Sequence, residues 1–144
     1  PVDIAVKQEI AFNGLIESFN KLNYVPHNEV VNYLKGAQML LLPINDTPNA
    51  MGVIPGKLFE YLAAKRPILC IGPVKGDSCR IIKETIAGYV FGFDEKENLK
   101  RIIQELYSAF KKSGFVDVSN KGIEKFSRKN LTGEMAELLN KIAK

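Results

Sequence analysis

Short, wholly apolar segments separated by helical patterns constrain the fold of this chain more than any other feature. Met39–Leu42 and Pro67–Ile71 contain only apolar residues, which is typical of strands buried on both faces of a parallel sheet. Phe19–Val25, where apolar and polar residues alternate, and Tyr89–Phe93 predict two more strands. The order of strand and helix signals predicts an α/β fold with a parallel sheet and right-handed crossovers.

The segments between these strands have the spacing of amphipathic helices. Apolar residues recur at i, i+3, i+4 and i+7, so one face of each helix is suited to packing on the sheet. The predicted helices are Val2–Phe12, Asn28–Ala37, Pro55–Ala64, one capped by Asp77 or Ser78 and ended by Gly88, one capped by Asp94 with Glu97 completing a capping box, and one that starts after Ser127.

Composition bounds the class of protein. The chain has 144 residues, 46% apolar and 25% charged, which predicts one globular domain over 1–144. No apolar run approaches the roughly 18 residues of a transmembrane helix. The chain begins with Pro1 rather than Met, and it opens on a helix, whereas doubly wound domains normally open on a strand. We therefore expect a fragment, cut near or just after its first strand.

Charge and the rare residue types exclude further classes. The net charge of +4 is spread along the chain, which favours solvated helix faces over a nucleic-acid partner. Cys70 and Cys79 are too few for a disulfide framework, so a reducing cytoplasm is the simplest location. His27 is the single histidine, which excludes zinc sites built on histidine pairs. A Ser-His-Asp triad would need His27 itself as the base.

The candidate functional site lies in the loops that follow the strands. Ligands of open parallel sheets bind outside the carboxyl ends of the strands. The loops expected there are Tyr24–Asn28, Pro43–Lys57 and Gly72–Ser78. The middle loop is the longest, and it leads directly into a helix.

The start of that helix carries the most specific chemistry. Gly52, Pro55 and Gly56 bring a backbone with small side chains to a helix N-terminus, where free N–H groups and the helix dipole favour an anion. Lys57 adds a positive charge, and Glu60 lies one turn further on. A carboxylate accepts two hydrogen bonds and so suits the adjacent hydroxyls of a ribose. This arrangement predicts a nucleotide site, and a surface ion pair between Lys57 and Glu60 is an equally compatible interpretation.

The segment Ile54–Leu69, IPGKLFEYLAAKRPIL, resembles the signature of the family-4 glycosyltransferases, which are retaining enzymes with the GT-B fold. The similarity extends in order over nearly the whole chain. It includes the flanking segments Tyr24–Glu29, Tyr33–Leu34, Ala37, Leu40–Pro43, Ala87–Val90 and Phe126–Ser127. The resemblance implies a Rossmann-like three-layer domain, the C-terminal half of a GT-B glycosyltransferase. An N-terminal acceptor-binding domain would belong to the same parent chain.

The resemblance also implies a substrate and roles for individual residues. The donor would be a UDP-, GDP- or ADP-linked sugar, and a hexosyl group would pass with retention to a glycan or lipid-linked acceptor. Glu60 would hold the ribose hydroxyls, and Lys57 would assist at the phosphates. The backbone of Ile54, Pro55 and Gly56 would contact the phosphates or the sugar. Tyr24, Val25 and His27 would belong to a loop near the base.

One position departs from the family pattern. The family commonly has two glutamates eight positions apart, and the second matches Glu60, whereas the first falls on Gly52. That first glutamate contacts the transferred sugar, so this contact is in question here. Asp46 and Asn49 lie in the same loop and are candidates to replace it.

The resemblance bears on cofactors and location as well. Family-4 enzymes use helix dipoles and basic side chains rather than a metal ion, and this sequence has no D-x-D pair for a divalent cation. The resemblance therefore implies no metal and no cofactor. It implies that this fragment binds nucleotide but hardly catalyses. A cytoplasmic location is expected, and the modest basic surplus is compatible with a lipid-linked acceptor at the inner membrane face.

Two other classes of protein remain open. A nucleotide-sugar epimerase has the same two-domain architecture, but it would need more carboxylates and histidines in the cleft. A non-catalytic α/β interaction module, such as a receiver, would need an acidic cluster at its first strand, which this sequence lacks. Nucleotide binding would separate the enzyme classes from the interaction module.

Overall fold

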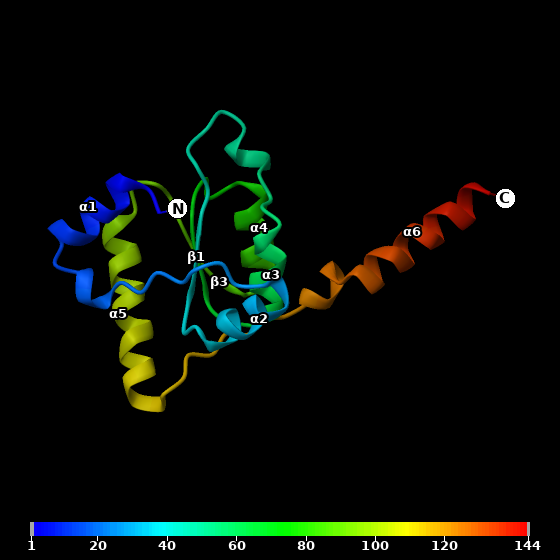
Figure 1. Cartoon of the computed structure of the whole chain (residues 1–144). Coiled ribbons are helices and arrows are strands. Elements are labelled where there is room, and N and C mark those ends of the chain that lie inside the picture. The colour runs from blue at the N-terminus through cyan, green and yellow to red at the C-terminus, as the bar shows by residue number, and fades with distance from the viewer. Residues whose placement is uncertain (1, 144) are drawn as a thin grey trace. The chain divides into compact units, whose positions relative to one another are not determined.

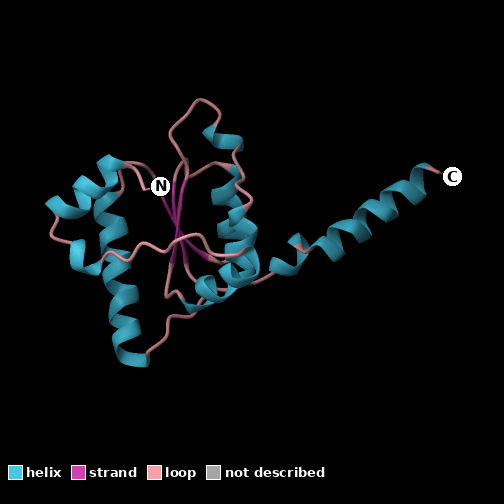
Figure 2. Cartoon of the chain, in the orientation of Figure 1, coloured by secondary structure: helices cyan, strands magenta, loops and turns pink. Residues whose placement is uncertain are grey.

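The computed structural model describes residues 2–143, which form six α-helices and one parallel sheet of three strands. Figure 1 labels these elements, and Figure 2 distinguishes helices from strands. The chain divides into two compact units, residues 1–30 and residues 31–144. Each unit is described by itself.

The first unit contains α1 (Ile4–Phe12) and a short 3-10 turn. The Asp3 carboxylate accepts a hydrogen bond from the N–H of Ala5 at 2.8 Å and so caps α1, and the helix predicted here is confirmed. The strand predicted over Phe19–Val25 is wrong, because residues 19–26 have irregular backbone. None of the described side chains of this unit is buried. An alternating pattern makes a strand only where a neighbouring strand supplies hydrogen bonds.

The second unit contains the sheet, in the order β1-β2-β3 with both pairs parallel. Its register aligns Leu40 with Ile68, and Ile68 with Gly88. Three of the four predicted strands are thereby confirmed to within one or two residues. Their bounds are Leu40–Pro43 for β1, Ile68–Ile71 for β2 and Gly88–Phe91 for β3. The arrangement is α/β and consistent with a Rossmann-like fold.

Helices cover the two faces of this sheet. Ile68 and Cys70 of β2 belong to one hydrophobic cluster and Leu69 to the other, because successive side chains of a strand point to opposite faces. The first cluster includes residues of α3 (Lys57–Ala64) and α4 (Asp77–Glu84), and the second includes residues of α5 (Lys96–Ser113) (Figure 1). α6 (Arg128–Ile142) also lies in this unit, whereas α2 (His27–Gly36) begins in the first unit and ends in the second.

The predicted end of α4 is wrong. The helix ends at Glu84, and Gly88 is instead the first residue of β3. A Cβ atom at Gly88 would collide with the backbone of Ile68, so this glycine permits close approach of β3 to β2. The left-handed conformation that follows the helix is adopted by Ile86, with φ of 50°.

Two predicted helix caps are also wrong. Gly76, rather than Asp77 or Ser78, occupies the N-cap position of α4. α5 begins after Glu95, without a side-chain cap, so the box of Asp94 and Glu97 does not form. The Glu95 carboxylate accepts a hydrogen bond from Gly92 N–H instead. Local sequence spacing identifies capping residues, but the direction in which the chain enters the helix decides whether they reach it.

The predicted start of α6 is confirmed. Ser127 Oγ accepts a hydrogen bond from Asn130 N–H at 3.2 Å, as an N-cap serine should. Figure 1 shows α6 extending away from the sheet, and none of its described residues is buried. Across residues 2–143, no helix combines the length and the apolar character needed to cross a membrane.

Candidate functional site

An open depression of about 470 Å³ lies at the carboxyl end of β1. It is formed by the loop between β1 and α3, in the position where open parallel sheets bind ligands. Its lining is both polar and apolar, and includes Asn45, Thr47, Asn49 and Lys57 together with Val53 and Pro55. The depression lies in the middle loop that the sequence predicts as the site, and ligand binding there stays a prediction.

Backbone and side-chain contacts hold this loop in place. Ile44 is buried, and its N–H donates to the carbonyl of Ile71 at 2.8 Å, which extends the β1–β2 ladder by one residue. Thr47 Oγ1 donates to Asn49 Oδ1 at 2.9 Å. Ser78 Oγ in α4 donates to the Val53 carbonyl at 2.6 Å. The depression therefore has a lining that is ordered before any ligand arrives, which lowers the entropic cost of binding.

The start of α3 leaves part of its backbone free for a ligand. The N–H of Leu58 donates to the Pro55 carbonyl at 2.9 Å, and the N–H of Phe59 donates to the Gly56 carbonyl at 3.1 Å. The N–H groups of Gly56 and Lys57 have no acceptor among residues 2–143. No atom lies within 4 Å of the Cβ position of Gly56, so the backbone is open to approach here. Two donors of the helix start remain for an anion, whereas an uncapped helix leaves four.

Lys57 and Glu60 occupy different positions relative to the depression. Lys57 is exposed and contributes to the lining, whereas Glu60 is exposed one turn along α3 and does not contribute. The alternative interpretation of these residues as a surface ion pair is not supported, because no such pair joins them in the described part of the chain. Burial, and secondly the charge of Glu60, raise the pKa of the Tyr61 hydroxyl above its ordinary value.

The predicted base-binding residues belong to the first unit and are therefore described apart from the depression. Tyr24 is 92% exposed, and Val25 is half-buried. His27 is exposed as the first residue of α2. A role of these three residues near a nucleotide base stays a prediction.

Sequence reasoning missed two of the polar residues that line the depression. Asn45 and Thr47 follow a buried strand directly, which was the available signal, but no motif singles them out. Asn49, named as a replacement for the missing glutamate, does line the depression, whereas Asp46 does not. Ile54 is 41% exposed and lies outside the lining.

The loop before α4 packs closely against the loop of the depression. A Cβ atom at Gly76 would lie 3.0 Å from the Pro73 carbonyl oxygen and 3.1 Å from that of Met51. The tight turn between β2 and α4 therefore explains why residue 76 is a glycine. This supports the interpretation of Gly72–Ser78 as an ordinary connection rather than an anion loop.

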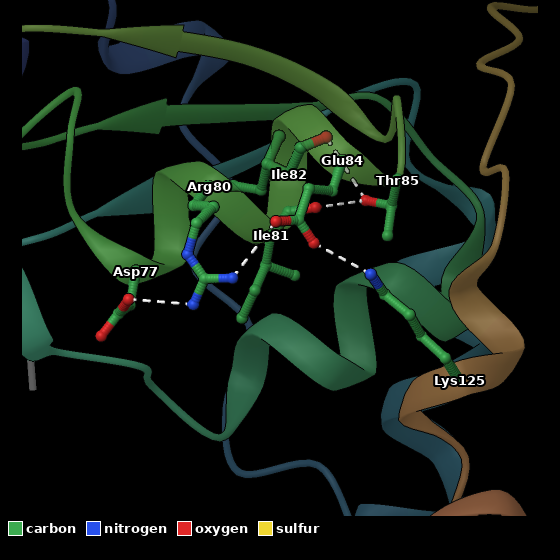
Figure 3. A network of polar contacts seen from close by, with 7 residues as sticks. All are labelled: Asp77, Arg80, Ile81, Ile82, Glu84, Thr85 and Lys125. Atoms are coloured by element: carbon green, nitrogen blue, oxygen red, sulfur yellow. Dashed lines mark hydrogen bonds and ion pairs between the residues drawn. The ribbon is translucent and has the colours of Figure 1, made fainter.

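A network of exposed charges covers the outer side of α4 (Figure 3). Arg80 pairs with Asp77 at 3.0 Å and with Glu84 at 3.2 Å, and Lys125 pairs with Glu84 at 2.9 Å. The hydrogen bond from Lys125, followed by that from Arg80, holds the pKa of the Glu84 carboxyl below its ordinary value. The carboxylate of Asp77 at the helix start is already occupied by Arg80, so this network stabilises the surface of α4.

The described residues contain no evident metal site. Within residues 2–143, no group of three or more His, Cys, Asp or Glu side chains is placed to hold a metal ion. No protein-family model, curated protein or solved structure matches this chain.

Proposed function

We propose that this chain is the donor-binding domain of a retaining glycosyltransferase and that a nucleotide-diphosphate sugar binds in the depression beside α3. The proposal is supported by the resemblance of Ile54–Leu69 to the family-4 signature. The observation that carries it is the position of Lys57 at the depression, next to two backbone N–H groups without an acceptor among the described residues. Together they offer a cation and dipolar donors at one end of a parallel sheet.

The diphosphate, the ribose and the sugar of the donor each have a matching group. The Lys57 ammonium and the N–H groups of Gly56 and Lys57 bind diphosphate oxygens. Glu60, one turn further on, accepts hydrogen bonds from the two ribose hydroxyls. Asn45 and Asn49 supply amide groups for sugar hydroxyls, in place of the glutamate that the family has at position 52. When the bond to the sugar breaks, negative charge grows on the diphosphate, and Lys57 stabilises it.

The acceptor would be bound by another domain of the parent protein. This chain alone then binds the donor but hardly transfers the sugar. The proposed location is the cytoplasm, with a glycan or lipid-linked acceptor at the inner membrane face.

Calorimetric titration with UDP, GDP, ADP and their hexose conjugates tests the proposal. We expect one nucleotide series to bind, and Lys57→Ala to lower its affinity about tenfold or more, since a charge-assisted hydrogen bond contributes about 1.5–3 kcal/mol. Lys100→Ala is the matched control, because Lys100 is exposed on α5 and makes no polar contact in the described structure. Absence of binding by all three series contradicts the proposed donor site.

A second comparison isolates the ribose contact. Glu60→Ala should weaken binding of the ribonucleotide, while binding of its 2′-deoxy analogue changes less, because only the ribonucleotide presents both hydroxyls. Glu97→Ala on α5 is the control for loss of an exposed carboxylate. Equal affinity of the Glu60→Ala variant and the unmodified chain for the ribonucleotide removes Glu60 from the site.

Gly56→Ala tests close approach of the ligand to the backbone. Gly56 has ordinary helical angles, φ −54° and ψ −36°, and an open Cβ position, so alanine fits without strain. Binding should fall although the stability of the fold is kept, because the added methyl group occupies the space of the phosphate. Gly36→Ala, also at an open position, is the control.

A further inference from the structure

Two cysteines that the proposed function does not use lie against each other in the core. Cys70 is in the central strand β2, and Cys79 is the third residue of α4. Their Sγ atoms are 3.7 Å apart, and the residues are 0% and 1% exposed. A disulfide bond is about 2.05 Å long, so the sulfurs need to approach by roughly 1.7 Å. We propose that Cys70 and Cys79 form a reversible intrachain disulfide when the chain is exposed to hydrogen peroxide.

The surroundings distinguish the two thiols. Cys79 lies in the first turn of α4, where the helix dipole favours a thiolate. The hydrogen bond between the two sulfurs lowers the pKa of the Cys79 thiol, and the nearby charge of Lys83 adds to this, against the effect of burial. The same hydrogen bond and burial raise the pKa of the Cys70 thiol. Cys79 is therefore the nucleophile, and Cys70 is the thiol that resolves its oxidised form.

The oxidation balances in two steps. The Cys79 thiolate attacks one oxygen of hydrogen peroxide, the O–O bond breaks, and the hydroxide released takes up a proton to become water. Cys79 is then a sulfenic acid. The Cys70 sulfur attacks the Cys79 sulfur, the S–O bond breaks, and the departing hydroxide leaves as water with the proton of Cys70. Two thiols are oxidised by two electrons, and one peroxide is reduced to two molecules of water.

Burial determines which oxidants can act. Hydrogen peroxide is only slightly larger than water, and it reaches the sulfurs when the first turn of α4 opens locally. A bulky aromatic disulfide requires far more room and should not label the folded chain. The same turn is bonded to the loop of the depression through Ser78 and the Val53 carbonyl. The new bond would thus fix to β2 the turn that supports that loop.

Mass spectrometry of the folded 144-residue chain tests the proposal. The chain is treated with hydrogen peroxide, quenched with catalase, denatured and alkylated. We expect a product that carries no alkyl group. Its mass should be about two units below that of the reduced, unalkylated chain, because two hydrogens are lost. Dithiothreitol should return it to the doubly alkylated form.

Single variants test the assigned order of attack. Cys70→Ser should retain a sulfenic acid at Cys79, which dimedone traps on denaturation, whereas Cys79→Ser should leave Cys70 free for alkylation. Cys70→Ala and Cys79→Ala replace any serine variant that does not fold. The proposal is overturned if the unmodified chain keeps two alkylatable thiols, gains oxygen without a cross-link, or links to a second chain. Dimedone labelling of Cys70 rather than Cys79 overturns the order.

Discussion

α5 buries Ile102 and Leu106 against the sheet, whereas α6 buries none of its described residues. Both helices have apolar side chains at helical spacing, so both have a face suited to a core. For α5 the partner is present, because Leu69, Phe91 and Val116 belong to the same hydrophobic cluster. The comparison shows that an amphipathic pattern specifies a helix and its apolar face, while coverage of that face depends on the rest of the molecule.

The difference has an energetic consequence. Burial of apolar side chains stabilises α5 at about 25 cal/mol per Å² removed from water. α6 instead depends on its internal hydrogen bonds and on the cap at Ser127, and isolated helices of about 15 residues are marginal in water. The exposed apolar residues of its stripe are Leu131, Met135, Leu138, Leu139 and Ile142. We therefore expect mutations in the two regions to differ strongly in their effect on unfolding.

The largest effect is expected at Gly88, in the covered part of the molecule. Gly88→Ala puts a Cβ atom into the backbone of Ile68, which cannot move without breaking the β2–β3 ladder. We expect the free energy of unfolding to fall by about 3 kcal/mol or more, measured by urea denaturation. Gly133→Ala in α6, where the Cβ position is open, is the control and should raise helicity slightly. Equal stability of the two variants would contradict the close approach at Gly88.

A matched pair of leucines compares the two helices directly. Leu106→Ala in α5 removes a side chain that is 6% exposed, and should cost about 2–3 kcal/mol of unfolding free energy. Leu138→Ala in α6 makes the same chemical change at a residue that is 54% exposed. It should change the free energy of unfolding by no more than about 0.5 kcal/mol. Thermal and urea unfolding give both values. A large cost at Leu138 would show that its face is covered in solution.

The covered region was largely predictable from the sequence. Met39–Leu42 and Pro67–Ile71 are apolar at every position, so their composition alone indicates burial on both faces. The alternating pattern of Phe19–Val25 contains no information about a hydrogen-bonded neighbour, and no strand forms there. The prediction that Gly88 ends a helix is wrong because a glycine can either end a helix or allow a neighbouring strand to approach closely. Only the position of Ile68 distinguishes these two roles.

The candidate site was predictable in part. Pro55 and Lys57 line the depression as expected, because a helix that follows a parallel strand begins at the carboxyl edge of the sheet. Asn45 and Thr47 were missed, since no local pattern specifies which polar residues of this loop face the depression. The start of a helix after a parallel strand can be predicted from the sequence. The polar side chains that tertiary contacts orient toward a depression cannot.

The smallest effect is expected at the charge network that joins α4 to the 3-10 turn η3 (Ile123–Phe126), just before α6. The pKa of Glu84 is held below its ordinary value, first by Lys125 and then by Arg80. A depressed pKa in the folded state stabilises the fold above the unfolded pKa, and this contribution is lost as pH falls through the folded pKa. Both charged groups are well exposed, so the change in stability is expected to be slight.

Titration of the Glu84 carboxyl by NMR measures this contact without depending on stability. Lys125→Met should raise the pKa of Glu84 toward its ordinary value, because it removes the largest cause of the shift. Arg80→Met should raise it less, and Lys121→Met should not move it, because Lys121 makes no polar contact in the described structure. If Lys125→Met leaves the titration unchanged, Glu84 does not hold η3. The attachment of η3 would then depend on the packing of Ile123 and Phe126 against the first hydrophobic cluster.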